Sequence, residues 1–197
     1  MIKSLQINAI FSDSVAAIEQ GRCLSGRIAL ACEALIACLE NGGKILICGN
    51  GGSAADSLHF SSELLNKYQR ARRPLPAISL VADAATLTSI GNDETFDHVF
   101  SKQVEALGRT GDVLVAISTS GNSPNILTAV QAAQQLGVRT IALNGRDGGA
   151  LSELLGEADI DLVVPGEKTA RIQEVHGIII HAFCDLIDQQ LFGESTT

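Results

Sequence analysis

Ile45-Leu-Ile-Cys-Gly-Asn-Gly-Gly-Ser-Ala-Ala-Asp56 carries the strongest structural signal in the chain, and Leu58-His-Phe-Ser-Ser-Glu63 follows almost at once. A short apolar run, typical of a buried strand, ends in a glycine-rich turn that opens a helix. On that helix His59 and Glu63 are four residues apart, so their side chains project from one face. A phosphate-binding turn and a proton-transfer or metal-binding pair are therefore expected within two helical turns. This combination indicates an enzyme that acts on a phosphorylated small molecule.

Continuous apolar runs alternate with helical patterns beyond residue 43. The predicted strands are 44–48, 77–81, 113–118, 140–143 and 161–164, and the predicted helices around them are 53–68, 84–90, 96–107, 123–136, 150–155 and 169–192. Buried strands separated by helices form a parallel sheet with both faces covered, so we expect an α/β three-layer sandwich. Two more helices fill the first forty residues and end at Asn41-Gly-Gly43.

No linker, repeat or low-complexity tract divides the chain, so we expect one domain over 1–197. Within it, 1–42 is expected to be a helical segment used in oligomer packing, 43–192 the sheet core with the last helix, and 193–197 a disordered tail. The first two helices and the last one carry wide apolar faces, including Ile178-Ile-Ile180. These faces exceed what one small domain covers, so an interface between copies of the chain is expected.

Composition excludes several classes of protein. A formal charge of -8 and a pI near 4.9 oppose nucleic-acid binding, which depends on clustered lysine and arginine. The one basic stretch, Arg70-Ala-Arg-Arg73, is interpreted as a solvated helix end. No apolar run approaches the ~20 residues that cross a bilayer, and no leader precedes the fold, so no membrane association is expected.

Five cysteines form an odd, scattered set without a C-x-x-C pair. This pattern favours reduced thiols in a cytoplasmic protein over a disulfide framework. Cys32, Cys48 and Cys184 lie in apolar runs and are expected to be small core residues.

Ligands of parallel α/β sheets bind at the carboxyl ends of the strands. The loops 49–53, 118–123 and 144–149 follow the first, third and fourth predicted strands. The second loop, Ser-Thr-Ser-Gly-Asn-Ser, offers hydroxyls and backbone N–H groups at the start of a helix, where the helix dipole favours an anion. We therefore assign a phosphate monoester to the loop 118–123.

The glycine turn has two alternative interpretations. Gly49, Gly51 and Ala54 match the G-x-G-x-x-A pattern of dinucleotide sites, but that pattern requires an acidic residue about 20 positions further on, and Asp83 lies some thirty residues beyond. The P-loop consensus is absent. The simplest alternative is a tight turn without a ligand.

The histidines also have structural alternatives. His59 and Glu63 could be a surface pair, and His181, which follows three isoleucines, could be a core imidazole. Helical geometry places Glu174 about 20° from His181 around the axis and Gln173 about 80° away. Angular position alone favours Glu174 as the partner of His181.

The segments CGNGGS, HFSSEL, GND, ISTSGNS, DGG and RIQEVH, with the later histidine, occur in order along nearly the whole chain. This set resembles the bacterial phosphoheptose isomerases (sedoheptulose 7-phosphate isomerases, GmhA type) of the sugar isomerase (SIS) domain class. The resemblance implies a flavodoxin-like five-stranded sheet and a homotetramer with active sites at subunit interfaces. It also implies conversion of D-sedoheptulose 7-phosphate, a phosphorylated seven-carbon sugar, to D-glycero-D-manno-heptose 7-phosphate, the first step of ADP-heptose synthesis for lipopolysaccharide core.

The resemblance further implies the residues of the site. Positions that match the zinc ligands of the family are His59, Glu63, Gln173 and His181. Positions that match its substrate contacts are Asn50, Gly51, Gly52, Ser53, Glu63, Asn92, Asp93, Ser118, Thr119, Ser120, Ser123 and Gln173. One family member has an acidic residue where this chain has Ala170, so a substrate contact from that position is not expected here.

Interconversion of a ketose and an aldose moves a proton between C1 and C2 while the carbonyl moves the opposite way. Glu63 as base and His181 as acid suit these steps through a cis-enediolate, and a zinc ion would act as a Lewis acid. A carboxylate bound to zinc is a weaker base than a free one. We therefore expect Glu63 to be only a loose or shared zinc ligand.

Two other functions are possible within the same class of domain. The first is a non-catalytic protein that binds the replication initiator DnaA (DiaA type), but that relative lacks the acid and imidazole that match Glu63 and His181. The second is a sugar-responsive transcription regulator, which requires an added helix-turn-helix segment. The presence of Glu63 and His181 favours the isomerase.

Overall fold

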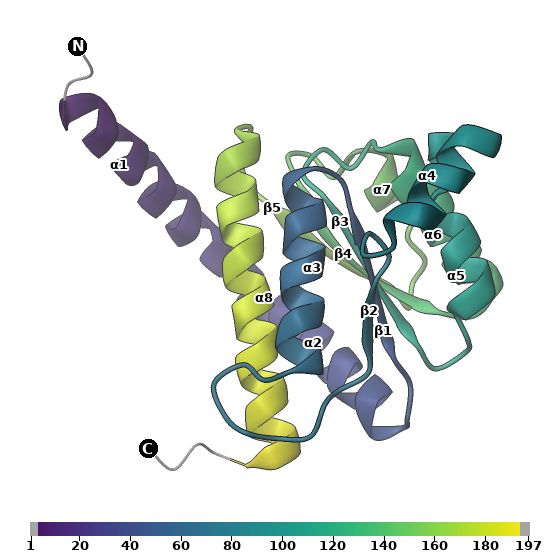
Figure 1. Ribbon diagram of the computed structural model, residues 1–197. Helices are drawn as coiled ribbons and strands as arrows, with labels where there is room; N and C mark the ends of the chain where they lie inside the picture. The colour runs from purple at the N-terminus through teal and green to yellow at the C-terminus, as the bar shows by residue number, and fades with distance from the viewer. Residues whose placement is uncertain (1–3, 194–197) are drawn as a thin grey trace.

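A five-stranded, fully parallel sheet forms the middle layer of the molecule, and its strand order is β2-β1-β3-β4-β5 (Figure 1). In this computed structural model, which describes residues 4–193, the strands are β1 (Ile45–Gly49), β2 (Ala77–Ser79), β3 (Val113–Ser118), β4 (Arg139–Gly145) and β5 (Ile160–Val164). The flavodoxin-like order brings all five carboxyl ends to one edge. The predicted α/β sandwich is confirmed, and strand ends differ from the prediction by one or two residues.

Helices cover both faces of the sheet. They are α1 (Ser4–Gly21), α2 (Ser25–Glu40), α3 (Gly52–Leu65), α4 (Ala84–Asp93), α5 (Ser101–Leu107), α6 (Pro124–Gln135), α7 (Gly149–Leu154) and α8 (Thr169–Phe192), with 3-10 turns at Arg22–Leu24 and Phe96–His98. Figure 1 shows α2, α3 and α8 on one face and α5, α6 and α7 on the other.

Three helices differ from their predicted ranges by more than one residue, and the first is α4, which continues past the predicted end at 90 to Asp93. The predicted helix 96–107 is divided into a 3-10 turn and α5, and at the division the Ser101 hydroxyl donates to the His98 carbonyl, a bond that competes with regular helix. The predicted helix 53–68 stops at Leu65, because the guanidinium of Arg72 donates to the carbonyl oxygens of Glu63 and Leu64 and so caps the helix.

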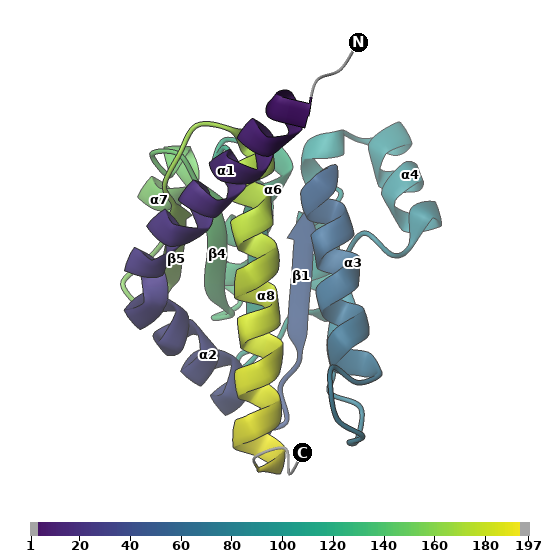
Figure 2. The same cartoon turned by 90° about the vertical axis from the view of Figure 1, so that its left-hand side faces the viewer.

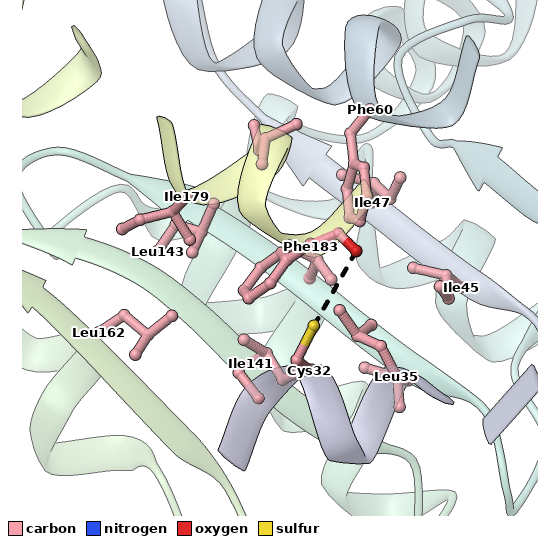
Figure 3. Close-up of a cluster of buried hydrophobic side chains, with 14 of the residues drawn as sticks. Cys32, Leu35, Ile45, Ile47, Phe60, Ile141, Leu143, Leu162, Ile179 and Phe183 are labelled. Atoms are coloured by element: carbon pink, nitrogen blue, oxygen red, sulfur yellow. Dashed lines mark hydrogen bonds between the residues drawn. The ribbon is translucent and has the colours of Figure 1, made fainter. Parts of the chain in front are cut away.

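The larger core lies between the sheet and the layer that contains α2, α3 and α8. Figure 3 shows the Phe183 ring of α8 among the side chains of Cys32 and Leu35 of α2 and of the sheet residues Ile141 and Leu143. Cys32 donates its thiol to the Phe183 carbonyl at 3.9 Å. A second cluster fills the opposite face. Cys32, Cys48 and Cys184 are all buried and all five cysteines are free thiols, which confirms the expected core role of these three.

Helix α1 extends beyond the body of the domain and contacts it mainly along α8 (Figure 1). Its anchors are polar: Arg171 donates to the Ser14 hydroxyl at 2.7 Å, and Lys168 pairs with Asp13 at 2.5 Å. The large apolar side chains that it leaves exposed are Leu5, Ile7, Ile10, Phe11 and Val15. Among residues 4–193 no helix is long and apolar enough to span a bilayer. The tail expected at 193–197 lies outside the described residues except for Gly193.

The core imidazole of α8 belongs to His176, and the alternative that His181 is buried is wrong. His176 is 0% exposed and its Nε2 donates to the Asn144 carbonyl at 2.9 Å, whereas His181 is exposed. Both follow apolar residues, but only His176 points toward β4. Burial lowers the pKa of His176 to about 4, although its hydrogen bond to Asn144 opposes this shift.

We expect His176 to make the protein acid-sensitive. In the unfolded chain a histidine takes up a proton near pH 6.5, but in the folded protein His176 does so only near pH 4, so unfolding gains protons between these values. Its contribution to stability is complete above pH 6.5 and is lost as the pH falls toward 4, by roughly 3 kcal/mol. In His176→Gln, which keeps a donor for Asn144, urea unfolding should lose less stability over this window than in the parent. Equal losses would contradict the expectation.

Candidate functional site

Helices α3 and α8 run side by side in the same direction over the sheet (Figure 2). Helix α3 begins directly after β1, because Gly51 adopts φ 55° and ψ −117°, a conformation that few residues other than glycine reach. Deeper in the layer, the rings of Phe60 and Phe183 pack with centroids 6.0 Å apart. This packing fixes the spacing between the two helices that carry the predicted catalytic residues.

His59 of α3 and His181 of α8 meet between the helices. Their Nε2 atoms are 3.0 Å apart, and the rings meet edge to face at an angle of 72°. Glu63 Oε1 lies 3.9 Å from His59 Nε2, and the ring of Tyr68 stacks on His181 with centroids 5.8 Å apart. His59 and Glu63 are 45% and 22% exposed, so this cluster is open to a ligand. The structure therefore brings an early carboxylate and a late imidazole together within one chain.

Gln173 lies about two turns before His181 on α8, beside the start of α3. Its Nε2 donates to Asp56 Oδ1 at 3.4 Å, whereas Glu174 pairs with Arg171 at 2.7 Å. Within residues 4–193, no hydrogen bond links Gln173 to His59, Glu63 or His181. Of the two residues weighed as partners on α8, Gln173 is thus the one that faces α3.

Asp56 is a member of this site that our sequence analysis did not single out. It lies one turn before His59 on the same helix face, and this spacing was the available signal. Burial raises the pKa of its carboxyl, opposed by the Gln173 hydrogen bond and by nearby His59. Its Oδ2 is buried and has no partner among the described residues, as expected of an atom that awaits a ligand or water.

The loops at the carboxyl edge are joined by a pair of amides. The side chains of Asn50 and Asn125 exchange two hydrogen bonds, at 2.8 and 2.9 Å, and so link the glycine turn to the first turn of α6. Asn125 is 2% exposed and was also missed, because its role depends on contact with a loop 75 positions away. The pair holds the glycine turn and the start of α6 side by side.

The hydroxyl loop after β3 is pre-formed. The Ser118 hydroxyl accepts from the Gly121 N–H at 3.1 Å, and the Ser120 hydroxyl accepts from the Asn122 N–H at 3.3 Å. Ser123 is the N-cap of α6, and its hydroxyl makes no capping bond. Thr119 is half-buried in the same loop, and Ser53, at the first turn of α3, is 6% exposed. Free N–H groups and hydroxyls thus converge at a helix N-terminus, which suits an anion.

Asn92 and Asp93 lie apart from these groups. They form the last turn of α4, and the Asn92 amide donates to Asp93 at 2.8 Å. Both are exposed, and none of their hydrogen bonds within residues 4–193 reaches the glycine turn, the hydroxyl loop or the histidine pair.

The donor set between α3 and α8 is chemically suited to zinc, which prefers imidazole nitrogen and carboxylate oxygen. Two nitrogens on one tetrahedral zinc lie about 3.4 Å apart, and the observed separation of the histidine nitrogens is 3.0 Å. The side chains of the described chain, as placed, form no group of three or more His, Cys, Asp or Glu that could hold a metal. A third ligand therefore requires Glu63 or Gln173 to turn toward the pair.

The basic stretch Arg70–Arg73 is not the solvated helix end that we expected. It lies in the loop after α3, and the side chain of Arg72 is only 1% exposed, paired with Asp188 of α8 at 2.6 Å. The interpretation was wrong because a buried acid on a distant helix cannot be recognised from local composition.

Comparison with known proteins gives a consistent result. A family model described as the SIS domain matches residues 11–145. A phosphoheptose isomerase of Chromohalobacter salexigens is 56% identical over 168 residues, which cover 85% of this chain and 85% of that protein.

Two solved structures agree in fold over almost their whole length. Phosphoheptose isomerase GmhA from Neisseria gonorrhoeae matches with a TM-score of 0.90 at 50% identity, covering 94% of this chain and 98% of that chain. A phosphoheptose isomerase from Francisella tularensis matches with a TM-score of 0.92 at 49% identity, covering 95% and 100% respectively.

Gly52→Ala tests the position of Gln173. A Cβ at Gly52 would lie 2.4 Å from Gln173 Oε1 and 2.5 Å from Nε2. Because the amide ends a flexible side chain, we expect it to be displaced while the free energy of unfolding changes by less than about 1 kcal/mol. Turnover of a phosphosugar substrate should fall about tenfold or more.

The matched control is Gly177→Ala in α8, where an added Cβ meets nothing within 4 Å. It should keep full turnover and gain up to about 1 kcal/mol of stability. Full turnover in Gly52→Ala would contradict a role for the placement of Gln173.

Proposed function

The chain belongs to the SIS domain family and, within it, to the phosphoheptose isomerases, and from this premise we propose that it converts D-sedoheptulose 7-phosphate to D-glycero-D-manno-heptose 7-phosphate. The observation that carries the proposal is the meeting of His59, Glu63 and His181 between α3 and α8. The pre-formed hydroxyl loop 118–123 lies at the carboxyl edge of the sheet, where α3 also begins. In a bacterial cell this reaction would supply the first intermediate of ADP-heptose synthesis for lipopolysaccharide core.

The phosphate is assigned to the loop 118–123. Ser118, Thr119, Ser120 and Ser123 offer hydroxyls there, and the N-terminus of α6 supplies N–H groups and a favourable dipole. Asn50, Gly51, Gly52 and Ser53 adjoin this loop through the Asn50–Asn125 amide pair and are assigned to the sugar hydroxyls. Asn92 and Asp93, at the end of α4, are assigned to substrate as well, either in this chain or in a neighbouring copy.

Proton transfer is assigned to Glu63 and His181. Glu63 removes a proton from C1, beside the carbonyl, and returns it to C2, while His181 donates a proton to the C2 carbonyl oxygen and takes one back from the C1 hydroxyl as the new carbonyl forms. The intermediate between the two steps is a cis-enediolate. His59 adjoins this acid, with its Nε2 3.0 Å from the Nε2 of His181.

A zinc ion is proposed as the cofactor, held by His59 and His181 with Glu63 and Gln173 as further ligands. When bound, it would act as a Lewis acid that lowers the energy of negative charge on the substrate oxygens. The buried and unpartnered Oδ2 of Asp56 lies on the same face of α3. Through the bond to Gln173 Nε2, Asp56 keeps the amide oxygen of Gln173 free for a ligand.

Nothing favours the DnaA-binding alternative. The relatives that match most of the chain at 50% identity or more are phosphoheptose isomerases, and the acid and imidazole that such a binding protein lacks are both present here. Five free thiols support a cytoplasmic location for the enzyme.

Glu63→Gln and His181→Gln test the assignment of acid and base. Each should lower turnover of sedoheptulose 7-phosphate by about 10²–10⁴-fold, the usual contribution of a positioned acid or base. NMR detection of the heptose product, with and without a chelator, measures turnover. Bound zinc is quantified separately, so that loss of metal is distinguished from loss of proton transfer. Substantial turnover in a variant would remove that residue from the chemistry.

A homotetramer is proposed because α1 exposes a row of large apolar side chains that one domain leaves uncovered. Light scattering should give four times the chain mass of 20.6 kDa. Phe11→Asp, at a side chain that is 68% exposed in the isolated chain, should shift the protein to smaller species because it buries a charge in the interface. A monomeric parent protein would contradict the proposal.

A further inference from the structure

We propose that Tyr68 is a positioning residue for the imidazole of His181, and that Arg72 anchors the loop that carries it. The proposal rests on the proposed function for the role of His181 and adds a third element, the loop 66–76, to the site between α3 and α8. Neither Tyr68 nor Arg72 was assigned to the site from the sequence.

The ring of Tyr68 lies nearly parallel to that of His181, with an angle of 27° between their planes. His59 meets the same imidazole edge-on, at 72°. A histidine that binds a metal or moves a proton is usually oriented by a hydrogen bond at its other ring nitrogen. Within residues 4–193 the hydrogen bond of His181 is the one to His59, so aromatic contact takes over the orienting role.

The loop that carries Tyr68 has no helix or strand of its own, and Arg72 fixes it in place. The Arg72 guanidinium donates to the carbonyls of Glu63 at 2.7 Å and Leu64 at 2.8 Å, and pairs with Asp188 at 2.6 Å. The side chains of Arg72 and Asp188 are 1% and 5% exposed. A buried guanidinium with several partners fixes the position of its loop more closely than a solvated ion pair would.

The partners of Arg72 belong to the two helices that carry the reactive residues. Glu63 itself is on α3, and Asp188 follows His181 by seven residues, so it lies two turns further on nearly the same face of α8. Arg70 also donates to the Gly193 carbonyl, and Arg73 lies 5.8 Å from the centre of the Phe192 ring. The loop is therefore tied to the ends of both helices, and Tyr68 is held against His181.

The contacts of the Tyr68 ring and of the Tyr68 hydroxyl differ, so their contributions can be tested separately. The hydroxyl makes no hydrogen bond to the described part of the chain, whereas the ring packs on His181 and on the larger core. Tyr68→Phe should therefore preserve the positioning, and Tyr68→Leu should remove it while keeping an apolar side chain of moderate size. Gln69→Ala, an exposed change in the same loop, is the matched control.

The experiment measures kcat and KM for sedoheptulose 7-phosphate in the parent and the three variants. Tyr68→Phe and Gln69→Ala should stay within about twofold of the parent in both constants. Tyr68→Leu should lose about tenfold to a hundredfold in kcat, because small displacements of a reacting group cost this much. Its KM should change little, since Tyr68 does not contact the hydroxyl loop. Equal losses in the Phe and Leu variants, or parent kcat in the Leu variant, would overturn the proposal.

A second measurement does not depend on turnover. Competition with a chelator gives the zinc affinity of each variant, and NMR of labelled imidazoles reports the environment of the His181 ring. Tyr68→Leu should weaken zinc about tenfold and move the His181 signals, and Tyr68→Phe should do neither. If the parent protein does not turn over the sugar, the proposed function fails, and the zinc and NMR results still decide the role of Tyr68.

Arg72→Lys tests the anchor, because lysine keeps the charge beside Asp188 and loses the forked bonds to α3. Like Tyr68→Leu, it should lower kcat. The double variant Tyr68→Leu/Arg72→Lys should lose less in kcat than the product of the two single losses, because both changes act through His181. Thermal unfolding confirms that the variants are folded. Independent, multiplying effects would overturn the link between anchor and ring.

Discussion

The packing of α8 against α3 is the constraint on which the site depends. One helix starts at the first glycine turn and the other closes the fold, and the phenylalanine contact in the core sets their distance. Because each helix presents one imidazole at the same height, the Nε2 atoms of His59 and His181 come within 3.0 Å of each other, and the ring of Tyr68 stacks on His181 from the loop between α3 and β2. A shift of one turn, about 5.4 Å along either axis, would separate these imidazoles altogether.

The site divides its tasks between two kinds of structure. Backbone groups at the carboxyl edge of the sheet, held by the amide pair of Asn50 and Asn125, suit the fixed charge of a phosphate. Side chains on the helix pair suit proton transfer, which requires groups that change charge. In the proposed function, phosphate recognition therefore depends on the carboxyl edge of the sheet, and proton transfer depends on the helices that cover it.

Much of this arrangement could be predicted from the sequence, and the exceptions share a cause. Alternation of apolar runs and helical patterns located all five strands, since burial on both faces leaves a local signature. His59 and Glu63 could be paired because helical spacing is also local. The buried state of His176 rather than His181 could not be predicted, because both follow apolar neighbours and only the packed helix shows which face meets β4.

Long-range polar contacts account for the other misses. Arg72 was expected to be solvated, because the stretch 70–73 has the composition of an exposed segment. Its acidic partner, Asp188, is 116 positions away in the sequence. Asp56 lies on the same face of α3 as His59, but its role depends on a hydrogen bond from the Gln173 amide of α8. Asn125 likewise acquires a role only when its loop meets the glycine turn. Where a polar side chain gains its partner through tertiary contact, pattern and propensity carry no information about it.

Helix α8 follows all five strands in the chain, and this order has a consequence for biosynthesis. A nascent polypeptide can complete its five strands while the last helix is still inside the ribosome, yet the apolar layer that receives Phe183 and Ile179 then remains open to water. A fragment that ends before this helix would expose its apolar layer, and chaperones or proteases would bind it. Protection of the hydrophobic layer and assembly of the site between α3 and α8 therefore arrive together, once α8 has left the ribosome.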